Sequence, residues 1–536
     1  MDKTGIAFVT PEMAIHQSIP TYTGGLGYVS ASAARSARKL ELPFIGITIL
    51  PQQGQYEQYV DSSGMKVRFT NWDYESVLEA TSINQMIYIC GSPVKYKAYV
   101  LPEDTFGNAP IYFITTNVEG NDNLSRSITL QLYGGTLASE ANSKRKIALS
   151  YVLAKGAIEI MKSLGFEDIV YHVNESHGVF VCIELMHQYI NEGISFDDAL
   201  AFTRGQILFT THTIVPAGNP MYNIDEINEI TGYRHDILFA CGGDSFNMFN
   251  MAKAGFFTSG HSNTVSKKHE EVVRHLWRGL IDDERLTSVT NGVDKFYWQC
   301  PEFERAKQTQ NLYLAKLKYK RAMLQKVRHL TERRWSENVP TIVWARRIEE
   351  YKRPWLILSD IDWLKERLNT NAFQLIFAGK PHPDNQPMID FWNYIYLLSN
   401  TIPNLIILPG YDLEMSKLLK AGTDFWLNTP RIGYEACGTS GMSAAMNGAL
   451  NISTPDGWMC EANPNNCFLF GTSTSDISQD AIDARDLRDL IDNTILPLYY
   501  RKEERYQMAL RAMKEAVIYW DSSRMMKEYT NLYYPE

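Results

Sequence analysis

Four cationic side chains occur within eight consecutive residues of this 536-residue chain. They are Arg346, Arg347, Lys352 and Arg353. Forked guanidinium groups and an ammonium group can bind the oxygens of one phosphoryl group together, so the cluster could hold a phosphate. A solvated charge run that pairs with Glu349 and Glu350 is the alternative interpretation. The stretch by itself does not distinguish a phosphate site from a solvated charge run.

A second stretch, residues 431–448, combines a carboxylate with glycines and small hydroxyl side chains. Its centre consists of Gly438, Thr439, Ser440 and Gly441. We expect a helix to begin there, with Thr439 or Ser440 accepting a backbone N–H bond as its cap. Free N–H groups and the positive end of a helix dipole bind anions, and Glu435 could bind sugar hydroxyls. The stretch indicates a site for a phosphorylated sugar, although an ordinary strand-to-helix turn would look similar.

Both stretches follow apolar runs, residues 341–344 and 425–427, which predict buried strands. The first half of the chain shows the same organisation. Strand-like residues 6–9 and 43–50 flank a glycine loop and a helix-favouring segment, a β-α-β unit typical of a parallel sheet. The candidate ligand-binding residues of this loop are Gly24, Gly25 and Leu26. Paired glycines let the backbone approach a ligand closely, although the full GxGxxG pattern is missing.

Two further apolar runs, residues 169–173 and 207–211, place His177 and His212 just beyond their C-terminal ends. In open α/β sheets, ligands bind at the carboxyl ends of the strands. Each histidine taken singly has an ordinary alternative as a capping or core residue. Their occurrence after consecutive strands favours a site.

Length and pattern together predict an α/β protein with two doubly wound, Rossmann-like domains. We expect an N-terminal domain over residues 1–300, a C-terminal domain over residues 301–510, and a final helix, residues 511–536, that returns to the first domain. Residues 305–331 read as one long surface helix, and residues 146–164 as another that stops at Gly165.

The composition excludes several classes of partner. A net charge of −9 and 21% charged residues argue against a nucleic-acid or anionic-membrane partner. The seven scattered cysteines include no C-x-x-C pair, and no histidine and cysteine cluster has zinc spacing, so we expect reduced thiols and no metal. No signal peptide or apolar span is visible. These features predict a soluble cytoplasmic protein. Its oligomeric state stays open, with a homodimer as one option.

These motifs resemble those of the α-glucan (glycogen and starch) phosphorylases, most closely the short microbial members. The resemblance extends over nearly the whole chain. It includes the glycine loop with residues 53–58, the His212 segment with Val215, Pro216, Ala217 and Gly218, residues 288–294, and the two stretches described first. It implies the GT-B glycosyltransferase fold, with two Rossmann-like domains facing a central cleft.

The resemblance also implies roles for individual residues. The residue matching His212 hydrogen-bonds the donor sugar near its reacting carbon, and the one matching Asn291 contacts the sugar 6-hydroxyl. Those matching Arg347 and Lys352 hold phosphate at the reacting centre, and Arg346 is expected to face the cofactor phosphate. With Glu435 orienting the sugar, the expected catalytic residues are His212, Arg347, Lys352 and Glu435.

One position departs from the family. Phosphorylases have a lysine that carries pyridoxal phosphate as a Schiff base, whereas this chain has Ser443. A serine hydroxyl cannot form an imine, so we expect no covalently bound pyridoxal phosphate. The leading hypothesis is a retaining glycosyltransferase that uses a nucleotide-sugar donor, whose diphosphate would occupy the phosphate site, and a sugar or small-molecule acceptor.

Two alternatives stay open. One is a glucan phosphorylase with or without noncovalent pyridoxal phosphate, and the other is a catalytically silent sugar-binding homologue. The nucleotide base, the sugar and the acceptor are not specified by any motif.

Overall fold

A computed structural model describes residues 4–133, 139–213, 219–309, 311–472 and 479–534. Val215, Pro216, Ala217 and Gly218 of the His212 segment lie outside the described residues. The chain forms two compact units. The first comprises Met1–Gln55, Phe69–Thr290 and Met525–Glu536, and the second comprises Tyr56–Arg68 and Asn291–Arg524.

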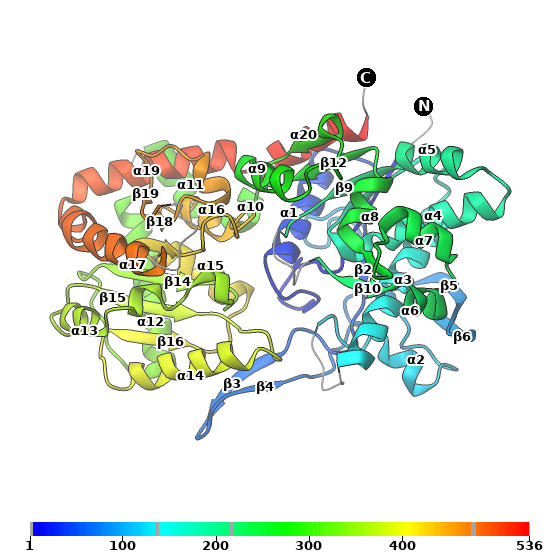
Figure 1. The fold of residues 1–536 in the computed structure, drawn as a ribbon. Coiled ribbons are helices and arrows are strands. Elements are labelled where there is room, and N and C mark those ends of the chain that lie inside the picture. The colour runs from blue at the N-terminus through cyan, green and yellow to red at the C-terminus, as the bar shows by residue number, and fades with distance from the viewer. Residues whose placement is uncertain (1–3, 134–138, 214–218, 310, 473–478, 535–536) are drawn as a thin grey trace. The chain divides into compact units, whose positions relative to one another are not determined.

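The first unit is built on a nine-stranded sheet (Figure 1). Its strands, in spatial order, are β13 (Leu286–Ser288), β12 (His261–Thr264), β9 (Ile207–Thr210), β8 (Ile169–Asn174), β1 (Gly5–Val9), β2 (Phe44–Ile49), β7 (Ile111–Thr115), β6 (Ser92–Leu101) and β5 (Glu79–Ile89). The first seven run parallel, and β6 and β5 extend the sheet antiparallel. A small antiparallel pair, β10 (Met221–Asn223) and β11 (Met248–Asn250), is separate.

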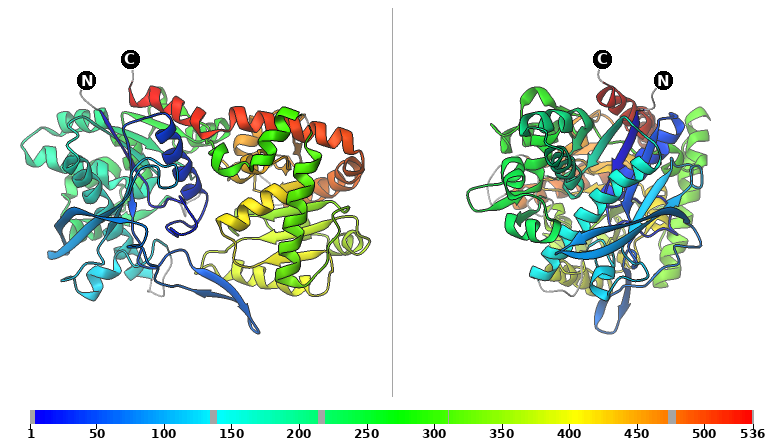
Figure 2. Two further views of the ribbon diagram at one scale, coloured as in Figure 1. Left: turned by 180° about the vertical axis from the view of Figure 1, so that it is seen from behind. Right: turned by 90° about the vertical axis from the view of Figure 1, so that its right-hand side faces the viewer.

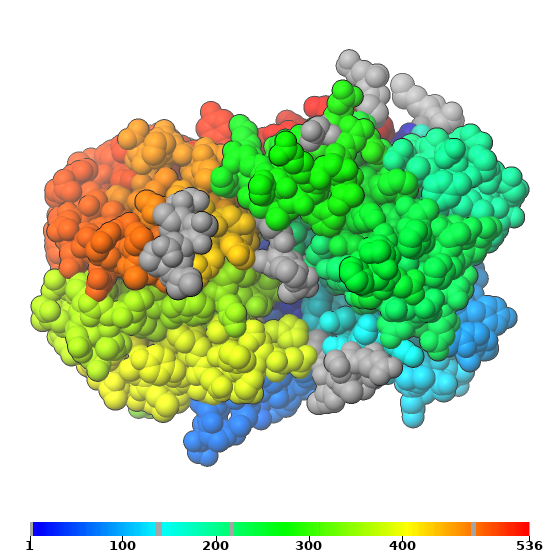
Figure 3. Space-filling model, in the orientation of Figure 1, coloured from blue at the N-terminus to red at the C-terminus, as the bar shows by residue number. Residues whose placement is uncertain are grey.

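Helices cover both faces of this sheet. They are α1 (Gly25–Lys39), α2 (Asn123–Ser127), α3 (Ser139–Ser163), α4 (Phe180–Asn191), α5 (Phe196–Gln206), α6 (Ile224–Thr231), α7 (His235–Gly242), α8 (Met251–Thr258), α9 (Lys267–Leu276) and α20 (Ser522–Tyr533). Buried side chains of α3 and α4 form the core on one face, and those of α1 and α20 form the core on the other. In the space-filling view, the green segments cover the face of this unit that is turned to the reader (Figure 3).

The second unit contains a six-stranded, all-parallel sheet. Its order is β16 (Leu405–Leu408), β15 (Gln374–Ala378), β14 (Thr341–Ala345), β17 (Phe425–Asn428), β18 (Leu450–Ser453) and β19 (Phe468–Leu469). Its helices are α10 (Lys295–Trp298), α11 (Pro301–Thr309), α12 (Tyr313–Thr331), α13 (Ile361–Asn369), α14 (Gln386–Ser399), α15 (Leu413–Gly422), α16 (Thr439–Ala445), α17 (Gln479–Leu490), α18 (Leu496–Tyr500) and α19 (Lys502–Tyr519). Seen from behind, α12 crosses one face of this sheet (Figure 2).

The fold class is therefore α/β of the GT-B type, as predicted, with two doubly wound units. Three local features differ from the sequence expectation. Residues 305–331 form two helices, α11 and α12, instead of one. The hairpin of β3 (Glu57–Asp61) and β4 (Gly64–Arg68) packs with the second unit, although it lies in the first half of the chain. The last helix joins the first unit only from Met525 onward.

Side-chain and backbone bonds anchor the hairpin. The Met65 backbone N–H donates to Oδ1 of Asn393 on α14 (2.7 Å), and the Gly410 N–H donates to Oε1 of Gln58 (3.0 Å). These partners lie more than three hundred positions away in sequence, so local pattern could not have assigned the hairpin to this unit. No described helix is both long enough and apolar enough to cross a membrane.

Candidate active site

The cationic stretch (residues 346–353) and the glycine-bearing stretch (residues 431–448) both lie at the topological switch point of the second unit's sheet. From β14 the chain goes to β15 on one side, whereas β17 pairs with β14 on the other. Loops that follow adjacent parallel strands diverge at such a point and leave a crevice where ligands bind. Arg346 follows β14, and Glu435 lies in the loop that follows β17. The sheet topology thus brings the phosphate and sugar candidates of this unit together.

Arg346 is a buried cation with weak protein partners. Its side chain is only 7% exposed. Its Nη2 lies 3.5 Å from the Leu427 carbonyl oxygen and 3.4 Å from Ser440 Oγ, and its Nε has no hydrogen-bond partner among the described residues. Burial lowers the pKa of Arg346, and Glu435 is the main group that counters this effect. A buried, incompletely satisfied guanidinium is suited to bind an anion.

Lys352 and Glu435 form a direct ion pair beside Arg346. Lys352 Nζ bonds to Glu435 Oε2, and the two side chains are 10% and 12% exposed. Burial alone would raise the pKa of Glu435, but the charges of Lys352 and then Arg346 outweigh it and lower the pKa. Glu435 is therefore held ionised, as an acceptor for hydroxyl groups.

Asp456 supports the backbone of the Glu435 loop. Its Oδ2 accepts the N–H groups of Tyr434 (3.1 Å) and Glu435 (2.8 Å), and its Oδ1 accepts that of Gly457 (3.0 Å). Burial raises the pKa of Asp456 to about 6. Sequence reasoning gave Asp456 no functional role. The available signal was an aspartate in the loop that follows β18.

This shifted pKa gives a testable pH dependence. The folded-state pKa of about 6 lies above the ordinary value of 3.8, so the folded protein binds this proton more tightly than the unfolded chain. The stability contributed by Asp456 must then increase as the pH falls. Relative to Asp456→Asn, the free energy of unfolding of the wild type is expected to rise by about 1–2 kcal/mol from pH 8 to pH 5. Urea denaturation of both proteins at the two pH values measures this, and a constant or falling difference contradicts it.

The four clustered cations have different environments. Arg353 is fully buried and structural: it contacts Asp483 (2.7 Å) and Asp480 (3.0 Å) and donates to the carbonyl oxygens of Thr429 and Pro430. The prediction that the four clustered cations could together hold a phosphate is therefore wrong for Arg353. Arg347 is 44% exposed, and its Nε lies 3.3 Å from Glu349 Oε1. Arg347 thus pairs with Glu349, as the alternative interpretation of a solvated charge run predicts.

The helix predicted near residue 439 begins there, but its cap differs from the expectation. The N-cap is Gly438, with no side-chain cap bond, so the prediction that Thr439 or Ser440 caps the helix is wrong. A Cβ added at Gly441 would come within 2.6 Å of Asn451 Oδ1, so packing against Asn451 explains that glycine. Ser443 is buried, and its Oγ donates within α16 to the carbonyls of Thr439 (3.3 Å) and Ser440 (3.1 Å). It offers no amine for an imine to pyridoxal phosphate.

Asn291 belongs to the second unit and is 2% exposed. Its Oδ1 is buried without a hydrogen-bond partner in the described part of the chain, and its backbone carbonyl accepts from Arg524 (3.1 Å). An unpaired amide oxygen requires a donor, which a sugar hydroxyl could supply. Asp294, by contrast, caps α10 by accepting the Phe296 N–H (3.1 Å) and is structural.

In the first unit, the glycine loop lies at the switch point between β1 and β8. Glu12, which sequence reasoning missed, holds the loop: its Oε2 accepts the Thr23 N–H and Oγ1–H (3.0 Å for the hydroxyl) and the Gly24 N–H (3.4 Å). A Cβ added at Gly25 would meet no atom within 4 Å. The α1 start is thus open at Gly25, and Leu26 beside it is part-buried, whereas the Thr23 and Gly24 amides are already paired.

His212 follows β9 and is held by Asn174, the last residue of β8, and by Glu175, which comes directly after it. Its Nε2 bonds to Asn174 Oδ1 (2.6 Å), and its backbone N–H donates to Glu175 Oε2 (2.9 Å). Burial lowers the pKa of His212 to about 3, so the imidazole is neutral at physiological pH.

Glu175 is strained as well as buried. It has φ 82° and ψ 160°, a region that residues other than glycine rarely adopt. Its carboxylate also accepts from Ser176 and Thr213. This residue fixes the His212 loop, and sequence reasoning gave it no role. Among the described residues, no group of three or more histidine, cysteine or acidic side chains is arranged to hold a metal.

Comparison with known proteins finds two matching families. Residues 5–282 match the starch synthase catalytic domain, and residues 300–494 match the carbohydrate phosphorylases. The chain is 35% identical to an uncharacterised protein of Methanocaldococcus jannaschii, over 98% of this chain and 99% of that protein. It is 29% identical to a maltodextrin phosphorylase of Thermococcus litoralis (99% and 70%) and 26% identical to a glycogen phosphorylase of Aquifex aeolicus (99% and 86%).

Proposed function

Because this chain belongs to the carbohydrate phosphorylase family, with a first half that matches the starch synthase catalytic domain, we propose that it is a retaining glycosyltransferase independent of pyridoxal phosphate. It would transfer a hexosyl group from a nucleotide-sugar donor to a sugar or small-molecule acceptor in the cytoplasm. The matches support a glycosyl-transferring enzyme in general. Our proposal adds the nucleotide-sugar donor and the independence of pyridoxal phosphate.

The observation that carries the proposal is the buried guanidinium of Arg346. Its Nε has no hydrogen-bond partner among the described residues, and its remaining contacts are long. A phosphoryl group would supply the missing acceptors. Ser443 has no amine to retain a covalently bound phosphate carrier in this unit, so the phosphate would arrive with a dissociable ligand. The diphosphate of a nucleotide sugar satisfies both requirements.

The chemistry assigned to these residues follows from charge. Cleavage of the anomeric bond builds negative charge on the departing diphosphate, and Arg346, Lys352 and the half-exposed Arg347 would stabilise it. Glu435, ionised beside Lys352, would orient the hexose through its hydroxyls. The carbonyl or imidazole of His212 is assigned to the sugar near its anomeric carbon, and Asn291 to the sugar 6-hydroxyl.

A second candidate function is an orthophosphate-dependent α-glucan phosphorylase. It is favoured by the names of the relatives, which include maltodextrin and glycogen phosphorylases. The same cations would then bind orthophosphate, with or without noncovalently bound pyridoxal phosphate.

Thermal unfolding with added ligands separates the two candidates. A ligand that binds only the folded state raises its stability by about 2.7 kcal/mol at one hundred times its Kd. We expect at least one of the uridine, adenosine, guanosine, cytidine and thymidine diphosphates to raise the melting temperature of the wild type and of Arg321→Met. Arg321 is 59% exposed and lies on α12, so it is the matched control.

The same nucleotide is expected to leave the melting temperature of Arg346→Met unchanged. A shift with pyridoxal phosphate or orthophosphate but with no nucleotide would overturn the proposal in favour of the phosphorylase.

A further inference from the structure

Lys420 is a buried amine in the second unit that sequence reasoning did not consider. It lies near the end of α15 and is 1% exposed, and its Nζ lies 3.7 Å from the centre of the Trp298 ring on α10. Lys417, one turn earlier on the same helix, lies over the Tyr297 ring in the same way, also at 3.7 Å. Lys417, however, is 26% exposed and lies 3.8 Å from Glu414. Of these two lysines, Lys420 is the one that the fold encloses.

The packing of α15 places Lys420 close to Arg346. This helix packs against β14, which ends at Ala345, and against α16, whose Ser440 Oγ lies 3.4 Å from Arg346 Nη2. Leu419, the neighbour of Lys420 in sequence, belongs to the same apolar cluster as Ala345. Burial lowers the pKa of Lys420 well below its ordinary value, and the charge of Arg346 lowers it further. The phosphate-binding region therefore contains an amine that loses its proton readily.

The other titratable groups around Lys420 come from several elements. Lys417, on the same helix, also lowers the pKa of Lys420. Tyr411, just before α15, stays protonated, because burial raises its pKa to about 12. Lys316 on α12 donates to the carbonyl oxygen of Ala421 (3.0 Å), and burial lowers the pKa of Lys316 to about 7. The helix α16 contributes no titratable side chain. A test of Lys420 must therefore compare variants, so that the contribution of Lys316 cancels.

A bound phosphate would bring more negative charge than the cations of this region balance. Lys352 and Glu435 form a direct ion pair, and Arg347 lies 3.3 Å from Glu349. Among these residues, Arg346 then contributes the net positive charge, whereas each phosphate of a nucleotide sugar is ionised at neutral pH. Excess charge in a buried site is costly, and a neighbouring amine gains a proton when an anion binds beside it.

We propose that Lys420 is a further residue of the phosphate site, neutral in the free protein and protonated when a phosphate-bearing ligand binds at Arg346. The ligand offsets the charge of Arg346, which otherwise opposes an ammonium group at Lys420. The proton comes from solvent, and no covalent bond changes. The inference rests on the phosphate site of the proposed function, but it applies to a nucleotide sugar and to orthophosphate alike.

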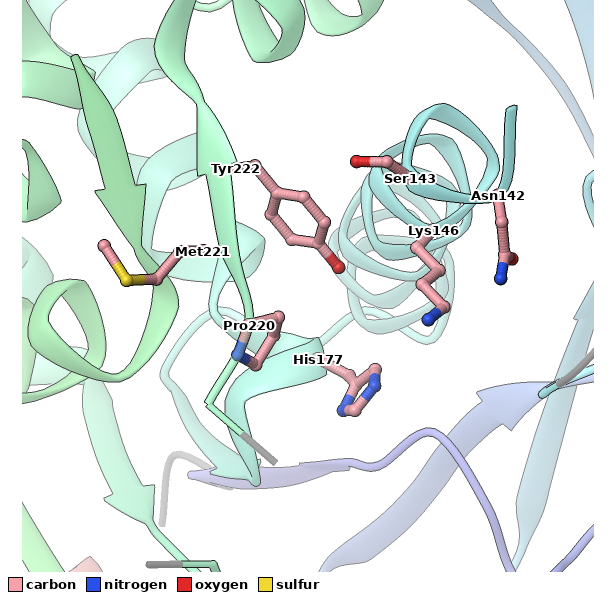
Figure 4. A pocket seen from close by; sticks show the side chains of 7 residues that line it. All are labelled: Asn142, Ser143, Lys146, His177, Pro220, Met221 and Tyr222. Atoms are coloured by element: carbon pink, nitrogen blue, oxygen red, sulfur yellow. The ribbon is translucent and has the colours of Figure 1, made fainter. Parts of the chain in front are cut away.

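Binding must then become tighter as the pH falls. The complex holds this proton more strongly than the free protein does, so the affinity rises by up to about tenfold for each pH unit between the two pKa values. Lys420→Met is expected to lose this dependence, and Lys146→Met to keep it. Lys146 is the matched control, a part-buried lysine of the first unit that lines a cavity of about 340 Å³. Its side chain points toward those of His177 and Tyr222 (Figure 4).

Isothermal titration of the full-length proteins at pH 7, 8 and 9, each in two buffers of different ionisation enthalpy, measures the protons taken up per ligand. The probes are the five nucleoside diphosphates of the thermal screen and orthophosphate. Any residual protonation of a probe affects all proteins equally. We expect the wild type and Lys146→Met to take up at least about half a proton more than Lys420→Met at one or more of these pH values.

Equal proton uptake in the wild type and Lys420→Met at all three pH values would overturn the proposal. A wild-type affinity that does not rise as the pH falls, or the absence of binding by every probe, would overturn it as well. If Lys420→Met does not fold, Lys420→Leu replaces it, and the pH dependence of the wild-type affinity tests the proposal without any variant. Lys420-dependent proton uptake with orthophosphate, without binding of any nucleotide, would refute the proposed donor and leave the role of Lys420 standing.

Discussion

Arg346→Met is expected to lower kcat for glycosyl transfer by roughly 10²–10³-fold, the effect of removing one preorganised donor to a developing negative charge. Methionine fills a similar buried volume, so the fold should persist while the guanidinium is lost. The Nε of Arg346 has no protein partner among the described residues. Removing this atom therefore does not deprive any buried protein acceptor of a hydrogen bond. Steady-state kinetics with the nucleotide sugar identified by the thermal screen give the measurement.

Two variants make this result specific. Arg346→Lys keeps a positive charge but loses the fork, so we expect an activity between those of the wild type and Arg346→Met. Arg321→Met, at an exposed ion pair with Glu337, should leave kcat unchanged. Near-wild-type kcat in Arg346→Met, together with an unchanged melting temperature, would remove Arg346 from the proposed site.

Asp424→Ala is expected to destabilise the protein by roughly 3–5 kcal/mol, because it leaves a buried charge without its partner. Asp424 Oδ2 lies 2.6 Å from Lys320 Nζ, and the two side chains are 7% and 5% exposed. The same oxygen accepts the Thr341 N–H (2.9 Å) at the start of β14. Burial would raise the pKa of Asp424, but Lys320, Arg505 and Lys316 together lower it. The pair therefore stabilises the fold at neutral pH and is lost only on strong acidification.

Urea denaturation at pH 7 measures this effect. Glu337→Ala is the control, since it breaks the neighbouring exposed pair with Arg321 (59% and 33% exposed), and exposed pairs contribute about 0–1 kcal/mol. The double variant Lys320→Met/Asp424→Leu should recover part of the loss, because no unpaired charge is then left at these two positions. Equal losses of stability in Asp424→Ala and Glu337→Ala would show that burial of the pair does not determine its contribution to the free energy of unfolding.

The strand pattern of the sequence predicted both strands that flank the second unit's switch point. Apolar runs at residues 341–344 and 425–427 became the adjacent strands β14 and β17, and the polar residues after them therefore lie together. Apolar patterning is a local property, so the two strands were predictable from the sequence, whereas their adjacency in the sheet comes from the structure.

The sequence did not show which of the clustered cations are structural and which are available to a ligand. Arg346 and Arg353 are equivalent in a sequence pattern, but Arg353 is neutralised by Asp480 and Asp483, which lie well over one hundred positions later. The same reason applies to Glu12 and Asp456, whose carboxylates hold loops rather than ligands. Tertiary partners decide whether a charged residue is structural or available to a ligand, and local spacing does not encode them. The Gly438 cap was missed because a glycine N-cap has no side chain whose bonding a sequence rule could anticipate.

The central claim is that the phosphate bound in the second unit belongs to the donor. Proton and phosphorus NMR of the purified protein with maltotriose tests it most directly, with nucleotide sugars of the five bases in separate samples and orthophosphate in another. The account predicts release of a nucleoside diphosphate, with retained anomeric configuration in the product, from one nucleotide sugar and no reaction with orthophosphate. Formation of glucose 1-phosphate from maltotriose and orthophosphate, without any nucleotide, would contradict it.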